Sequence, residues 1–146
     1  CAVLRRVLRV IMTVQEVPLQ YINMVWPSVE GFIASAIPHS GGDIALDEVK
    51  SYCLNGVWKL VVAVDEANTV HGAATLHFFN RINHRVGFIT TVGGKGILTP
   101  EVFSQFSDVL RSNGATCIEG SVRDSLMRLS ARFGAIKKSN NIQLVI

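Results

Sequence analysis

A glycine-rich stretch in the second half of the chain has the clearest capacity for chemistry. Gly93, Gly94 and Gly96 follow a β-rich run and precede a segment that begins with Thr99 and a proline. Glycines let backbone N–H groups approach a phosphate, and a helix N-terminus attracts negative charge. The same glycines could instead only turn a strand into a helix. Lys95, which lies between them, could touch a phosphate or be a solvated loop cation.

The histidines and cysteines form no metal-binding pattern. His71, His77 and His84 fall in or near predicted strands, and a metal site would need converging partners that the sequence does not place. Each is interpreted as a histidine on a strand face or edge, and we predict no metal site. Cys53 and Cys117 have apolar neighbours and are predicted to be buried free thiols, which fits synthesis in a reducing cytoplasm.

The elements that must position the glycines follow from the spacing of apolar residues. Residues 18–37 and 43–54 have helical spacing, and Pro27 predicts a helix restart within the first of them. Leu46, Val49 and Tyr52–Cys53 would form the buried stripe of the second helix. The spacing then changes to a period of two, and short polar turns separate three predicted strands that form an antiparallel meander. The bounds of these strands are 58–64, 70–79 and 85–92.

The remaining elements complete a β-α-β unit. Thr99 is predicted to cap a helix that ends at Asn113-Gly114. A strand at 115–122, a helix that begins at Asp124 and stops at Gly134, and final strands at Ile136 and 142–146 follow it. The sequence therefore predicts an α+β fold, with a mixed sheet that joins the meander to the β-α-β unit and helices on both faces.

Composition limits the class of protein. Hydrophobic residues make up 49% of the 146 residues and charged residues 17%, which excludes a disordered chain and favours a surface partly covered by other subunits. The net charge of +3 comes from Arg5, Arg6 and Arg9, since the remaining basic residues equal the 11 acidic ones. The body of the chain thus gives no strong nucleic-acid signal, and no apolar run is long enough for a membrane span.

The chain is expected to contain one domain. Residues 13–146 form the predicted domain, and residues 1–12 are an N-terminal extension. As a helix, the extension would separate apolar residues from its three arginines, a pattern that suits docking on a partner or a membrane surface. An ordinary terminal helix or strand packed on the domain fits the same residues.

The order of elements resembles the acetyltransferase-like (GNAT) fold, in which a meander leads through a glycine-containing loop into a helix. The loop of that family has the pattern Gln/Arg-x-x-Gly-x-Gly/Ala, and the aligned stretch here is Thr91-Val-Gly-Gly94-Lys-Gly96. The resemblance covers roughly residues 13–146 and implies that this loop binds acetyl-CoA if the protein is an enzyme. The residues implied as cofactor-binding are Val92, Gly93, Gly94, Lys95 and Gly96.

The sequence departs from the pattern of that family at residues that would bind the cofactor or take part in catalysis. Thr91 replaces the Gln or Arg at the head of the loop, and residues 97–99 separate the capped helix from Gly96. Ser130 stands where the resemblance places a tyrosine that protonates the leaving thiolate, and its hydroxyl is short and weakly acidic. Glu119 is the one obvious candidate for a general base. Glu119 and Ser130 are thus the catalytic candidates of a depleted site.

A narrower likeness concerns short segments. Residues 25–30, 56–62 and 113–119 are similar to GNAT-like proteins encoded among the virion genes of short-tailed bacteriophages. This resemblance implies a structural or accessory virion protein, internal or particle-associated, with a degenerate acyl-CoA site. It would be made in the host cytoplasm and would have other virion proteins as partners. The alternative is an active N-acyltransferase that transfers acetyl from acetyl-CoA to an amine.

Overall fold

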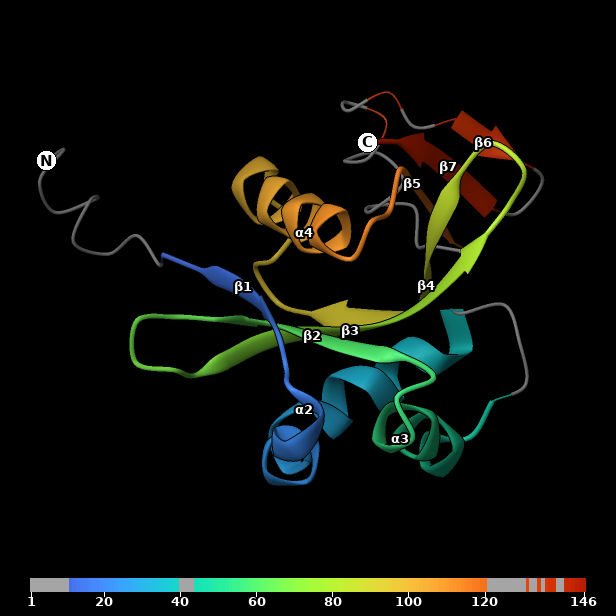
Figure 1. The fold of residues 1–146 in the computed structure, drawn as a ribbon. Coiled ribbons are helices and arrows are strands. Elements are labelled where there is room, and N and C mark those ends of the chain that lie inside the picture. The colour runs from blue at the N-terminus through green and yellow to red at the C-terminus, as the bar shows by residue number, and fades with distance from the viewer. Residues whose placement is uncertain (1–10, 40–43, 121–130, 132–133, 135, 139–140) are drawn as a thin grey trace, which may run out of the picture.

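The computed structural model describes residues 11–39, 44–120, 131, 134, 136–138 and 141–146 (Figure 1). These residues form one seven-stranded sheet with the order β1-β2-β3-β4-β5-β7-β6. The strands are β1 (Thr13–Glu16), β2 (Lys59–Val64), β3 (Val70–Asn80), β4 (Arg85–Gly94), β5 (Cys117–Gly120), β6 (Ile136–Lys138) and β7 (Asn141–Val145). The helices are α2 (Ile22–Ala36), α3 (Leu46–Leu54) and α4 (Pro100–Ser112), with the short 3-10 turns η1 (Leu19–Tyr21) and η2 (Ile37–His39).

The sheet is mixed, as predicted. Strands β1, β2, β3 and β4 pair successively in antiparallel orientation. Strands β4 and β5 are parallel, and β5, β7 and β6 are again antiparallel. Helix α4 connects the parallel pair, which gives the β-α-β unit expected after the meander. Figure 1 shows α4 on one face of the sheet and α2 and α3 on the other. The predicted α+β fold with helices on both faces is therefore confirmed.

Each face of the sheet has its own core. Beneath α4, Val61, Leu76 and Ile118 pack against buried residues of the helix such as Leu110. Beneath α2 and α3, Leu60 and Val62 pack against residues that include Trp26, Val29 and Ile33. The alternation of Leu60, Val61 and Val62 between the two cores is the period-two pattern that predicted this strand. The sheet is consequently buried on both faces where the helices cover it.

Helix α2 is continuous, so the predicted restart at Pro27 is wrong. Pro27 is the sixth residue of the helix, where it removes the hydrogen bond to the carbonyl of Asn23 at a cost of about 3 kcal/mol. The buried face of the same helix opposes this cost, because each large apolar side chain that it buries contributes about 1.5–3 kcal/mol. The buried residues are Ile22, Trp26, Val29, Ile33 and Ala36. Packing therefore overrides the local signal.

Two further features of the structure differ from the sequence predictions. Strand β1 was not predicted, because four residues give too short a pattern; its pairing with β2 and the burial of Val14 define it. In α3, Val49 and Cys53 are buried as expected, but Tyr52 is exposed and stacks on Trp58 with ring centroids 4.7 Å apart. The predicted helix from Asp124 lies outside the described residues except for positions 131 and 134.

Helix α4 begins as predicted. The Thr99 hydroxyl accepts a hydrogen bond from the Val102 N–H at 3.2 Å, and Pro100 occupies the first helical position. Farther along the helix, Gln105 anchors it to the edge strand: its side-chain oxygen accepts from the Val14 N–H, and its amide nitrogen donates to the Met12 carbonyl, both at 3.0 Å. The two hydrogen bonds of Gln105 thus hold the first half of α4 against the β1 end of the sheet.

Candidate functional site

Strand β4 extends beyond Gly120, the last described residue of β5, and we call this part of the sheet the fork. The two strands pair over four positions, from Val86 with Cys117 to Ile89 with Gly120. Strand β4 continues to Gly94, and among the described residues its positions 90–94 have no strand partner on the β5 side. At about 3.3 Å per residue, this open edge is roughly 17 Å long. Unpaired backbone N–H and C=O groups along such an edge can bind an extended ligand.

A β-bulge lies where the fork opens. In the β3–β4 register, Thr75 pairs with Thr91 and the next residue, Leu76, pairs with Ile89, so Thr90 is the extra residue. A bulge bends its strand and changes the direction of the side chains near it. This bulge immediately follows the last pair that the described residues of β4 and β5 form, and it bends β4 at that point.

Three threonine hydroxyls brace the bulge. Thr75 is fully buried, and its Oγ1 lies 2.6 Å from Thr90 Oγ1 and 2.7 Å from Thr91 Oγ1. Thr90 Oγ1 also donates to the Thr75 carbonyl at 2.9 Å. Each hydroxyl has one proton, so Thr75 must donate to Thr90 and Thr91 must donate to Thr75. The cluster is a directed chain that ends on the backbone of β3.

This chain explains why Thr91 departs from the pattern of the loop. Its side chain is 2% exposed and is bound to Thr75 inside the sheet, so it faces the core of the protein. Sequence reasoning did not find the cluster, although the adjacent pair Thr90-Thr91 in an otherwise apolar strand was a signal. The missing information was the register that brings Thr75 beside both residues.

Close packing accounts for two of the glycines that the sequence singled out. A Cβ on Gly93 would lie 2.3 Å from the Phe32 carbonyl oxygen of α2, and a Cβ on Gly94 would lie 2.6 Å from the Gly72 Cα on β3. Both glycines belong to β4 and not to the loop that follows. The structure thus gives them a packing role, and their contact with a cofactor stays a prediction, as does that of Val92.

The loop proper begins at Lys95. The Lys95 N–H donates to the His71 carbonyl at 2.9 Å, so this backbone donor is already used. Gly96 has a φ of +69°, and a Cβ there would meet nothing within 4 Å. Gly96 is therefore the one of the three glycines at which turn conformation and open space coincide. Helix α4 starts four residues later, which confirms the predicted separation from Gly96.

Glu119 is held in an ion pair. It is 8% exposed, and its Oε1 accepts from Arg81 Nη2 at 2.8 Å. Its Oε2 accepts from Gln143 Nε2 at 2.9 Å and lies 3.7 Å from the Cys117 sulfur. The carboxylate thus ties the β3–β4 turn to β5 and β7. This arrangement explains the burial of Glu119 without a substrate, and its role as a general base stays a prediction.

The histidines contact groups other than Glu119. Ser130 lies outside the described residues. His71 Nε2 lies 2.8 Å from Asp65 Oδ2, and hydrogen bonds from His71 and from the Thr69 N–H lower the pKa of Asp65. His84 Nδ1 lies 3.0 Å from Thr116 Oγ1. In the described part of the chain, no three potential metal ligands lie close enough to hold an ion.

The two interior cysteines are free thiols, as predicted. Cys53 and Cys117 are both fully buried. Burial raises the pKa of Cys53 to about 11. The pKa of Cys117 is also raised, first by burial and then by the neighbouring Glu119 carboxylate. Both thiols are therefore neutral at physiological pH and poor nucleophiles.

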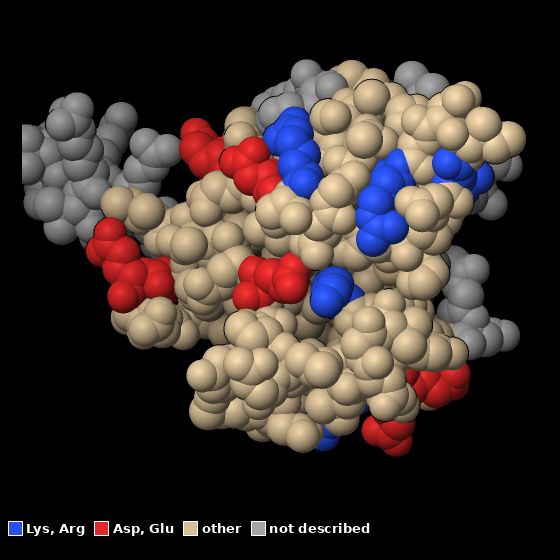
Figure 2. Space-filling view, viewed as in Figure 1, with Lys and Arg blue, Asp and Glu red and all other residues tan. Residues whose placement is uncertain are grey.

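The charged residues are dispersed. On the face in Figure 2, charged side chains form small separate groups, some with both signs side by side, and neither sign forms a continuous patch. Among the described residues, none of the helices combines the length and apolar character needed to cross a membrane. This face thus has no concentration of positive charge that would favour nucleic acid.

Comparison with known proteins identifies the architecture. No family model and no curated protein matches the sequence. Among solved structures, a GCN5-related N-acetyltransferase from Kribbella flavida matches 92% of this chain and 98% of its own, with a TM-score of 0.60 and 13% identity. The fold is that of GNAT N-acetyltransferases.

Two other structures agree. Spermidine N-acetyltransferase from Vibrio cholerae, in complex with CoA and spermine, covers 92% of this chain and 95% of its own, with a TM-score of 0.59 and 12% identity. An N-acetyltransferase from Staphylococcus aureus Mu50 covers 92% of this chain and 97% of its own, with a TM-score of 0.60 and 9% identity. Identities this low establish the fold alone. The resemblance to phage virion proteins stays a prediction.

Proposed function

We propose that this protein is an N-acyltransferase that takes its acyl group from an acyl-CoA bound along the open edge of β4. The fork carries the proposal: beyond Ile89, β4 has no partner on the β5 side among the described residues, and it continues toward Gly96 and the start of α4. The likeness to N-acetyltransferases over 92% of the chain supports it.

The residues at the fork suit the parts of such a ligand. The N–H and C=O groups of residues 90–94 suit the amides of an extended pantetheine arm, in the manner of an added strand. The backbone at Gly96 and beyond, beside the N-terminus of α4, suits the phosphates. The cofactor would supply a thioester, whose acyl group is activated for transfer to an amine. The bulge at Thr90 would fix the path of β4 beside that thioester.

In this proposal Glu119 does not act as the general base. Both of its oxygens already accept hydrogen bonds, and Arg81 neutralises its charge. A carboxylate in this state serves better as a brace for the β5 side of the fork than as a proton acceptor. The sequence hypothesis of a virion component gains no support from the fold, and we retain it only as a prediction.

Calorimetric titration of acetyl-CoA tests the proposal. We expect saturable binding at micromolar concentration. Gly96→Asp should weaken it at least tenfold, because aspartate tolerates the left-handed backbone but places a negative charge beside the phosphates. Gly56→Asp is the matched control: Gly56 has a φ of +74° and equally open space, but it lies between α3 and β2. The Gly56→Asp variant should bind acetyl-CoA with the affinity of the wild type.

Two outcomes of the titration would contradict the proposal. Absence of binding at millimolar acetyl-CoA would refute it, as would equal losses in the two variants. Where binding is found, release of free CoA thiol in the presence of spermidine or another primary amine measures transfer.

A further inference from the structure

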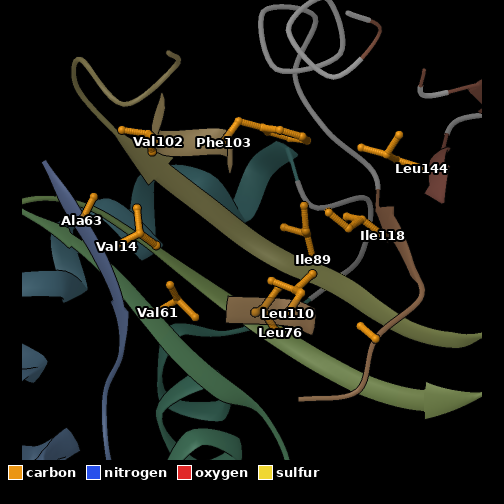
Figure 3. Packing of buried hydrophobic residues seen from close by; sticks show 11 residues of the cluster. Val14, Val61, Ala63, Leu76, Ile89, Val102, Phe103, Leu110, Ile118 and Leu144 are labelled. Carbon is orange, nitrogen blue, oxygen red and sulfur yellow. The ribbon is translucent and has the colours of Figure 1, made fainter. Parts of the chain in front are cut away.

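An apolar pocket lies between α4 and the sheet. The space inside it that the centre of a water molecule can occupy is about 60 Å³. Its floor comes from strands β1 to β5 and β7, and its roof comes from the first half of α4 and the loop before it. Figure 3 shows the buried side chains around it, with Ala63, Ile89 and Ile118 on strands and Val102 and Phe103 on the helix. The surface that it offers to a ligand is almost entirely hydrocarbon.

Small residues in the sheet create this space. Gly72 is not one of them, because the Ile97 side chain occupies the space above it, 3.0 Å from where a Cβ would lie. Ala63 and Ala74 stand on neighbouring strands of the floor, where the rest of the core has valine, leucine or isoleucine. The helix side chains above do not fill the gap that these positions leave. Protein interiors seldom keep such voids, so a row of small residues needs a reason.

The pocket joins the fork. Ile89 lines it and is also the last residue of β4 that pairs with the described part of β5. Ile118 lines it from β5, and Val92 lines it from the open stretch of β4. Ile97 and Leu98 connect it to the loop that begins at Gly96. A ligand along the open edge of β4 would therefore have the mouth of an apolar pocket beside it.

We infer that this pocket receives the acyl chain of the donor, so that the preferred substrate is an acyl-CoA with a chain longer than acetyl. The inference rests on the proposed function and specifies its substrate class. An acetyl group ends at one methyl and leaves the pocket empty, whereas a hexanoyl chain adds four methylenes. A dry cavity lined by aliphatic and aromatic side chains binds small hydrocarbons. Each methylene that it buries raises affinity about fourfold.

The test compares acyl-CoAs of different chain length by calorimetry. For the wild-type protein we expect hexanoyl-CoA to bind at least tenfold more tightly than acetyl-CoA, with about 200-fold as the limit for four fully buried methylenes. Ala74→Leu places a branched side chain on the floor of the pocket and should remove this preference. Ala34→Leu is the matched control, since Ala34 lies on the exposed face of α2; it should keep the wild-type ratio.

The possible failures are distinguishable. If neither acyl-CoA binds, the proposed function fails. If both bind with equal affinity, the proposed function stands and the acyl pocket is refuted. If hexanoyl-CoA binds more tightly but a folded Ala74→Leu protein keeps the ratio, the chain lies elsewhere and the inference is also wrong. Circular dichroism establishes folding, and Ala63→Val offers a smaller filling of the same pocket if Ala74→Leu is unstable.

Discussion

Substitution of Gly93 by alanine separates a packing role from a cofactor role for this residue. The carbonyl oxygen of Phe32 in α2 lies 2.3 Å from the position of the new Cβ, and the Phe32 carbonyl carbon lies 3.1 Å from it. Both are backbone atoms, so no side-chain rotation relieves the contact. The methyl group must push α2 away from β4.

The size of the effect follows from the packing of α2. Extra methyl groups in a tightly packed core cost about 1–3 kcal/mol, a substantial share of the 5–15 kcal/mol that stabilises a typical domain. We expect the upper half of that range, because Gly93 faces the helix that buries Trp26, Val29 and Ile33. In a chain of 146 residues, each kcal/mol lowers Tm by about 2–4 °C.

Urea denaturation of Gly93→Ala, wild type and Gly31→Ala measures this. Gly31 lies inside α2 and is exposed, and a Cβ there would meet nothing within 4 Å. Alanine at Gly31 should therefore stabilise the protein by about 0.5–1 kcal/mol, through its higher helix propensity. The identical substitution is thus expected to have opposite signs at the two positions. A Gly93→Ala protein as stable as the wild type, but impaired in acetyl-CoA binding, would refute the packing argument.

Three further predictions concern buried polar groups. Thr75→Val removes the middle hydroxyl of the chain and leaves the Thr91 donor without its acceptor, so unfolding free energy should fall by about 1–3 kcal/mol, whereas Thr75→Ser should restore most of it. Arg81→Met should cost about 1–3 kcal/mol in urea denaturation at pH 7, because the Glu119 side chain, which is only 10% exposed, would lose its charged partner; Glu119→Gln in the same protein should recover part of the loss, and no recovery would contradict the ion pair. For Cys53, the unfolded thiol ionises near pH 9.0 and the folded one near 11, so the stability that this group adds is full below pH 9 and is lost as pH rises toward 11. The stability difference between wild type and Cys53→Ala should accordingly narrow from pH 8 to pH 10.5, and a constant difference would contradict the burial argument.

Local sequence signals predicted most of the elements because they act over a few residues. Thr99 and Pro100 begin α4, and the apolar stripe of that helix continues to its end at Ser112. The change to a period of two predicted β2, β3 and β4 within two residues of their observed ends. Pro27 shows the limit of such signals, because burial of the α2 face outweighs one lost hydrogen bond.

The candidate site was predictable only in part. The glycine-rich stretch that the sequence singled out lies at the end of β4, in the region where we propose that the donor binds. The sequence could not show that Gly93 touches α2 or that Arg81 reaches Glu119, since 61 and 38 residues separate these pairs along the chain. Contacts of this kind depend on strand register and helix placement, which no local pattern encodes.

The chain itself therefore determined which segments become helices and strands and the order in which they occur, because propensity, capping and periodicity are properties of neighbouring residues. Tertiary structure decided the features on which our proposals rest: the extension of β4 beyond its described pairs with β5, the bulge at Thr90, and the pocket above Ala63 and Ala74. Each requires distant segments to meet in one register. Gly96 combines the two levels, because its residue type permits the left-handed turn and the packed sheet places that turn at the end of the fork.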